Sequence, residues 1–144
     1  MAILMYVDFR LSPEIKEEVD MALIGYMEGT NPDLLSTLCA QGHETLPLGN
    51  GADGHGKYIA HLTAADGVSA VIAYLHKLTP VSGMEHISID DRLFACRMHD
   101  IPVLLVVPEE FKSQAREKLE KETQEYVDLV SPGELQDEVL KVVE

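Results

Sequence analysis

Residues 101–107 read IPVLLVV, an unbroken apolar run near the start of the last third of the chain. A charged helical pattern follows over 109–123, and a second short apolar run follows at 126–130. Another helix is expected from Pro132, because proline suits the first position of a helix and the serine before it is a good cap. Continuous rather than alternating hydrophobicity is typical of parallel strands buried on both faces. This stretch therefore predicts a parallel sheet covered by helices.

The rest of the chain adds further elements of both kinds. Strands are expected at 2–9 and 57–62, with an edge strand at either 44–48 or 85–88. Helices are expected at 13–28, 31–42, 63–78 and 89–100. An alternative for the middle of the chain is one helix running from 56 to 78, which Gly67 and the β-branched residues disfavour.

Together these elements predict a three-layer α/β fold. The chain of 144 residues suits one domain over 1–144 with its own core. Its sheet should contain four or five mostly parallel strands between two layers of helices, the architecture shared by Rossmann-like and flavodoxin-like domains.

The expected helix at 13–28 suggests self-association. Met21, Ile24 and Met27 lie outside its main apolar stripe, so its second half is apolar nearly all round. Such a helix is buried on two sides. In a chain of this size, the second side is expected to face another subunit, which predicts a homodimer or a larger homo-oligomer.

Composition excludes several classes of function. The 25 acidic and 11 basic residues give a net charge of −14, which repels nucleic acids and favours a basic protein as partner. No apolar run approaches the ~20 residues that a membrane helix needs, so no membrane contact is expected. Cys39 and Cys96 do not form a disulfide framework, and the first residues do not resemble a signal peptide. These features predict a cytoplasmic protein.

A candidate binding site follows from the rule that ligands sit beyond the carboxyl ends of parallel strands. The glycine-rich loop at 49–56 is the expected cover, because glycine lets the backbone approach a ligand. The expected ligand contacts are Arg10, Ser12, Asn50, Gly54, His61 and Thr63.

Catalytic chemistry is a second interpretation of the same region. Asp8, Asp53, His55 and His61 are candidates for acid–base catalysis or for holding a divalent metal, provided that the loop folds back. The simpler alternative is that His55 is exposed and His61 is a hydrogen-bonded, semi-buried side chain.

Other motifs are weaker. Cys39-x3-His43 and Cys96-x2-His99 form a zinc site only if they converge, and both cysteines fall on apolar helix faces, so no metal is expected. The loop matches neither the dinucleotide-binding nor the P-loop glycine pattern, and no nucleophile elbow is present.

The sequence thus favours a non-catalytic, self-associating module that binds a small ligand or a partner subunit. An enzyme built around 49–56 and an accessory subunit of a larger enzyme are the alternatives. No cofactor is indicated.

Overall fold

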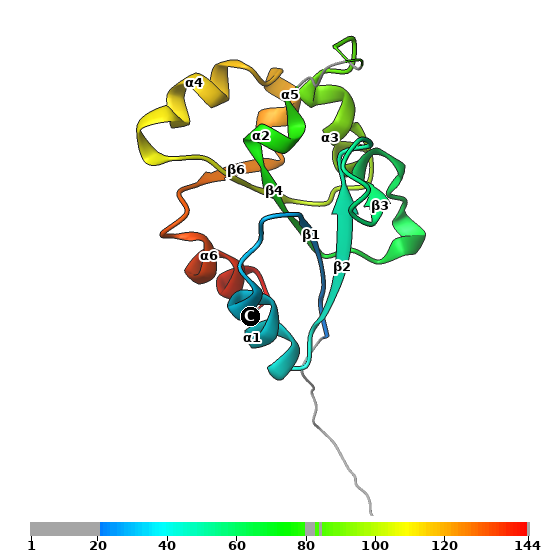
Figure 1. Cartoon of the computed structure of the whole chain (residues 1–144), viewed down its shortest axis with the longest axis vertical. Coiled ribbons are helices and arrows are strands. Elements are labelled where there is room, and N and C mark those ends of the chain that lie inside the picture. Colours follow the sequence, from blue (N-terminus) through cyan, green and yellow to red (C-terminus); the bar gives the residue numbers. More distant parts are fainter. Residues whose placement is uncertain (1–20, 80–82, 84, 144) are drawn as a thin grey trace, which may run out of the picture.

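The computed structural model describes residues 21–79, 83 and 85–143. Within them, six strands form one all-parallel sheet in the order β3-β2-β1-β4-β5-β6, which confirms the predicted three-layer α/β fold with more strands than expected (Figure 1). The strands are β1 (Leu23–Met27), β2 (Glu44–Gly49), β3 (Lys57–Tyr58), β4 (Ala70–Tyr74), β5 (Val103–Val106) and β6 (Val127–Val130).

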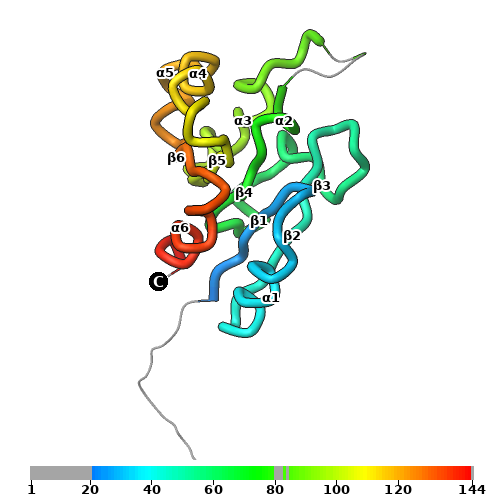
Figure 2. The backbone as a smooth tube through the Cα atoms, turned by 60° about the vertical axis from the view of Figure 1, so that its left-hand side comes forward, coloured from blue at the N-terminus to red at the C-terminus, as the bar shows by residue number. Residues whose placement is uncertain are grey.

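Helices cover both faces of this sheet. They are α1 (Pro32–Ala40), α2 (Leu75–Leu78), α3 (Ile89–Met98), α4 (Lys112–Glu117), α5 (Lys121–Gln124) and α6 (Leu135–Val142), with 3-10 turns η2 (Ile59–His61), η3 (Ala64–Asp66) and η4 (Glu109–Phe111). One apolar cluster lies between the sheet and α1 and α6, and the other lies under α3, α4 and the 3-10 turn η2. Figure 1 shows α1 and α6 close together, and Figure 2 shows α4 and α5 at the end of the molecule away from α1. None of the described helices is both long and apolar enough to cross a bilayer.

The run at 101–107 forms β5, as predicted. All four residues of β5 are buried, and the strand pairs with β4 on one side and β6 on the other. Leu104 faces one apolar cluster and Leu105 the other. Burial of both faces explains why no polar residue interrupts this stretch.

The prediction of a helix at 13–28 is wrong for its second half. Residues 23–27 form β1, which pairs with β2 and β4 and so occupies the middle of the sheet. Ile24 and Met27 pack on opposite faces. A central parallel strand is apolar on both sides, and periodicity alone does not distinguish it from a buried helix. Ile24 and Met27, two of the three residues that suggested a subunit interface, are therefore internal to the fold, whereas Met21 is exposed.

The region from 57 to 78 was also predicted wrongly. The strand expected at 57–62 is limited to β3, after which the chain turns into η2. The helix expected at 63–78 is instead η3, β4 and the single turn of α2. Thr63 and Asp66 form a capping box at the start of this region, but Gly67 ends the turn in the left-handed region at φ 70°. Strand pairing with β1 and β5 then outweighs the helical spacing of 68–78.

The remaining predictions agree in outline. Asn31 caps α1, and Ser88 caps α3. In return, the Asp91 carboxylate accepts a hydrogen bond from the Ser88 backbone amide. The edge strand expected at 44–48 is β2, which lies one position inside the edge, whereas 85–88 contains no strand. The helix expected at 109–123 is divided into η4, α4 and α5, and α6 begins at Leu135. The strand expected at 2–9 lies outside the described residues.

The order of the strands defines the place where a ligand is expected. From β1, the strands β2 and β3 follow one another towards one edge of the sheet. The strands β4, β5 and β6 then follow one another towards the other edge, on the opposite side of β1. The order reverses between β1 and β4. In sheets of this kind, ligands bind beyond the carboxyl ends of the strands around this reversal.

Gly25→Ala tests whether β1 is a packed strand. A Cβ at Gly25 would lie 2.5 Å from Leu48 Cδ1, and Leu48 is fully buried. We expect a loss of about 1–3 kcal/mol in the free energy of unfolding, measured with urea, because overpacking a core is costly.

The sign of this change separates the two interpretations of 23–27. In a helix, the same substitution would stabilise by up to about 1 kcal/mol. Gly133→Ala is the control, since nothing lies within 4 Å of its Cβ, and it should change stability little. Stabilisation by Gly25→Ala would contradict the strand.

Candidate functional site

Polar side chains from three segments gather at the carboxyl edge of the sheet. Glu28 follows β1, the loop 50–56 follows β2, and Lys77 lies in α2, directly after β4. The ammonium of Lys77 lies 2.6 Å from Glu28 Oε1 and 3.3 Å from Asp53 Oδ2. One cation thus joins the ends of three neighbouring strands.

Asn50 fixes the loop that follows β2. Its side chain is buried, and its Oδ1 accepts hydrogen bonds from the backbone amides of Ala52 and Asp53 at 2.8 and 3.0 Å. Its Nδ2 donates to the carbonyl of Lys77 at 2.9 Å. A short polar side chain that bonds its own backbone makes a tight turn without regular structure. These contacts hold 50–53 in one turn against α2.

Glycine is required at two positions around this loop. A Cβ at Gly49 would meet Asp53 Oδ1 at 2.8 Å and the His55 carbonyl at 2.9 Å. Gly56 has φ 75°, and a Cβ there would collide with the Pro47 carbonyl. The glycines predicted to admit a ligand therefore serve close backbone packing at these two positions.

Asp53 is the electrostatic centre of the loop. Burial acts to raise the pKa of its carboxyl, but donation from the His55 amide, the contact with Lys77 and the Asn50 amide outweigh it. The net result is a pKa below the ordinary 3.8. The pKa of Lys77 is raised, chiefly by its hydrogen bond to Glu28, although burial opposes the change. A lysine held protonated between two carboxylates is a structural cation and a poor nucleophile.

His55 is oriented by the backbone. Its Nδ1 lies 2.9 Å from the Leu48 carbonyl, which only accepts, so Nδ1 carries the proton. Its ring meets Tyr26 edge-on, with centroids 5.5 Å apart. Asp53 bonds the backbone amide of His55 at 3.1 Å and not its ring. Asp53, a candidate for acid–base catalysis, therefore stabilises the loop and does not orient the ring of His55.

Arg92 connects several segments at the carboxyl edge of the sheet. This residue of α3 is 0% exposed, and its Nε donates to the Asn50 carbonyl at 3.1 Å. Its Nη1 donates to the carbonyls of Leu78 and Ile87 at 3.3 and 3.0 Å. Its Nη2 is buried and finds no hydrogen-bond partner. One guanidinium thus joins the loop after β2, the end of α2 and the segment that leads into α3.

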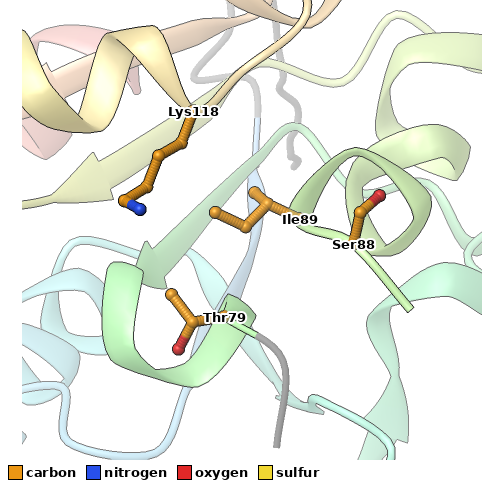
Figure 3. A pocket seen from close by; sticks show the side chains of 4 residues that line it. All are labelled: Thr79, Ser88, Ile89 and Lys118. Atoms are coloured by element: carbon orange, nitrogen blue, oxygen red, sulfur yellow. The ribbon is translucent and has the colours of Figure 1, made fainter. Parts of the chain in front are cut away.

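A cavity of about 200 Å³ opens beside this network. Thr79 at the end of α2, Ser88 and Ile89 at the start of α3, and Lys118 just after α4 line it. Figure 3 shows the side chains of Lys118, Ile89 and Thr79 converging on one space, while the Ser88 hydroxyl turns away. The cavity is formed by segments that follow β4 and β5, so it lies at the carboxyl edge.

The structure separates the residues predicted to contact a ligand or to act in catalysis. Asn50 and Asp53 lie in the network around Lys77, and Gly54 is exposed on the same loop. His61 is exposed and packs edge-on against Tyr58, with ring centroids 4.9 Å apart. Thr63 caps η3 by bonding Asp66, which pairs with Lys57 at 3.0 Å. Asp8, Arg10 and Ser12 lie outside the described residues.

Metal ligation finds no support in the described part of the chain, where no three His, Cys, Asp or Glu side chains are spaced to hold an ion. Cys39 is exposed on α1, whereas Cys96 is buried in the opposite apolar cluster. Burial raises the pKa of Cys96 to about 12, which disfavours the thiolate that binds zinc. The Nδ1 of His43 accepts a hydrogen bond from the Ala22 amide at 3.0 Å.

Several residues of the edge were not predicted from the sequence. Glu28 and Lys77 were missed because β1 and β4 were interpreted as helices, so their strand ends were not recognised. Arg92 gave a usable signal, since it falls within the buried stripe of α3 beside Ile89 and Leu93. A charged residue in such a stripe indicates a buried polar contact.

Arg92→Ala tests the tie between the three segments. The substitution removes donors from three carbonyls and leaves a cavity, so we expect a loss of about 2–4 kcal/mol in unfolding free energy, measured by urea denaturation. Arg97→Ala on the same helix is the control. Arg97 is partly exposed and lies 3.8 Å from Glu120, so its loss should stay below about 1 kcal/mol. Equal effects would show that Arg92 does not anchor the edge.

Asp53→Asn tests the lowered pKa of Asp53. A carboxyl whose folded-state pKa is depressed contributes stability above its unfolded pKa and loses it as pH falls through the folded value. The variant should therefore be less stable than the parent at pH 7, and the gap should narrow as pH falls below the ordinary 3.8. Denaturation curves at several pH values measure this gap. A gap that widens in acid would contradict the assigned charge state.

Comparison with protein-family models, with curated proteins and with solved structures finds no match to this chain. The strand order carries little functional information by itself, because one fold hosts many unrelated activities. Function is therefore inferred from the side chains and the cavity at the carboxyl edge.

Proposed function

We propose that this protein is a non-catalytic α/β module that binds a small molecule in the cavity at the carboxyl edge of its sheet. The observation that carries the proposal is the position of the cavity, which lies between segments that follow β4 and β5. Open parallel sheets bind their ligands at this edge. The sequence also predicted a binding site at the carboxyl edge of the sheet, but with other side chains as ligand contacts.

The size of the cavity limits the ligand. Its volume of about 200 Å³ is below the range of about 300–1,000 Å³ that is usual for drug-sized molecules. A water molecule takes about 30 Å³ in the liquid, so the space suits a ligand of roughly six to ten heavy atoms. A dinucleotide or a nucleoside phosphate exceeds this volume and would extend into solvent.

The wall of the cavity favours binding over catalysis. The hydroxyl of Thr79 donates to the His76 carbonyl at 3.2 Å. The hydroxyl of Ser88 accepts the Asp91 amide at 3.1 Å as the cap of α3. Both hydroxyls thus serve local structure: that of Thr79 bonds the backbone, and that of Ser88 caps α3 with the Asp91 carboxylate beside it.

Acid–base catalysis at His55 is a second candidate, favoured by one observation. The bond from Nδ1 to the Leu48 carbonyl leaves Nε2 as the atom that exchanges a proton, the arrangement that acid–base histidines use. Within the described residues, Nε2 makes no hydrogen bond. If His55 is the catalytic residue, ligands should shift the resonances of its ring, and His55→Ala should abolish their binding.

Self-association and location are further parts of the proposal. The apolar residues at 23–27 no longer support a homo-oligomer, but Phe94 and Met98 remain half-exposed on α3. Light scattering on concentrated protein measures the oligomeric state. The charge of −14 still favours a basic partner over nucleic acid. Cys39 and Cys96 are free thiols, as is usual in the reducing cytoplasm.

A library of small polar molecules tests the proposed binding by nuclear magnetic resonance on ¹⁵N-labelled protein. We expect bound molecules to shift the backbone amides of Thr79, Ser88, Ile89 and Lys118. Thr79→Leu, which adds bulk to the cavity wall, should abolish these shifts and leave the rest of the spectrum folded.

Thr37→Leu is the matched control. Its hydroxyl also donates to a backbone carbonyl, that of Asp33 at 2.8 Å, but it lies on α1 across the sheet. This variant should bind as the parent does. Shifts that gather around His55 would favour the acid–base candidate, and a library that shifts no amide near the cavity would overturn the binding proposal.

A further inference from the structure

The geometry points to a short-chain monocarboxylate as the class of ligand that this cavity takes, with its carboxylate at Lys118 and its hydrocarbon end against Ile89. This inference rests on the proposed function and adds the chemistry of the ligand. It follows from three features of the cavity: an apolar wall, one available cation, and neighbouring carboxylates that limit the charge of any guest.

The inner wall of the cavity is apolar. Ile89 is buried in the core cluster beneath α3, and its side chain points across the cavity towards Lys118 (Figure 3). The methyl group of Thr79 faces the same space, while its hydroxyl is turned to the His76 carbonyl. The Ser88 hydroxyl turns away as the helix cap. A guest therefore meets hydrocarbon on these sides, which favours an aliphatic end over a second polar group.

Lys118 supplies the positive charge. Of the five other lysines in the described chain, Lys57, Lys77, Lys112 and Lys141 form ion pairs, and Lys121 is exposed and lies outside the cavity. Within the described residues, Lys118 pairs with no carboxylate, although the protein carries 25 acidic side chains. Its side chain hangs over the cavity in Figure 3. An unpaired ammonium beside an apolar space matches a ligand with one anionic end.

Nearby charges restrict the ligand to a single negative charge. Asp90 and Asp91 lie in the first turn of α3, directly after Ile89 of the cavity wall. Asp91 accepts the Ser88 amide at 2.9 Å and Asp90 accepts the Glu120 amide at 3.0 Å, so both are held in place. The buried guanidinium of Arg92 offsets only part of this charge. A dianion such as phosphate meets more repulsion here, and the hydroxyls that would bond its oxygens are already engaged.

Butyrate, butyramide and inorganic phosphate provide the test, titrated into ¹⁵N-labelled protein at constant ionic strength. Butyrate and butyramide share their shape and differ in charge. We expect butyrate to shift the amides around the cavity with an affinity up to about fivefold above that of butyramide, the upper end of the range for an exposed ion pair. Phosphate should shift these amides less than butyrate at equal concentration.

Lys118→Gln should lower the affinity for butyrate to that for butyramide. Lys121→Gln is the matched control, because Lys121 is exposed at the start of α5 and outside the cavity. It should preserve the preference for butyrate. Two results would contradict a carboxylate ligand without contradicting the proposed binding site. They are equal binding of butyrate and butyramide by the parent protein, and stronger binding of phosphate. No shift from any of the three, with a negative library, would overturn both proposals.

Discussion

The burial of β1 and β4 on both faces is the constraint on which the rest of the structure depends. These strands lie in the middle of an all-parallel sheet, so each needs apolar side chains on two sides and small ones where neighbours crowd. Gly25 of β1 meets this need, since Leu48 of β2 occupies the space beside it. With both strands in place, their carboxyl ends bring Glu28 and Lys77 together.

The carboxyl edge is organised by a small set of buried polar contacts rather than by regular structure. Asn50 turns the loop after β2, and Arg92 binds that loop to the segments on either side of the cavity. Each contact satisfies backbone groups that would otherwise be buried without a partner. In this network, the polar side chains of the edge already bond one another or the backbone. The nearby cavity, with an unpaired lysine, is therefore the better candidate for a ligand site.

The sequence predicted the fold class because 101–107 forms a buried strand and because the helices capped by Asn31 and Ser88 form where they were expected. It failed at 23–27 and 70–74, where residues apolar on every side suit a central strand and a buried helix equally. That error concealed Glu28 and Lys77, since a site at strand ends requires the correct strands. Asn50 and Asp53 were found through the glycine-rich loop, although their contacts proved structural. Thr79 and Lys118 line the same cavity although they are far apart in the sequence, and no sequence pattern predicts that they lie close together.

The most direct test of this account is the backbone conformation of 21–28, measured by nuclear Overhauser effects and amide hydrogen exchange. A central strand predicts contacts from Gly25 to Leu46 on one side and to Val71 on the other, with slow exchange across β1. Sequential amide–amide contacts typical of a helix, or rapid exchange at Ile24 and Tyr26, would contradict the sheet order and with it the placement of the site.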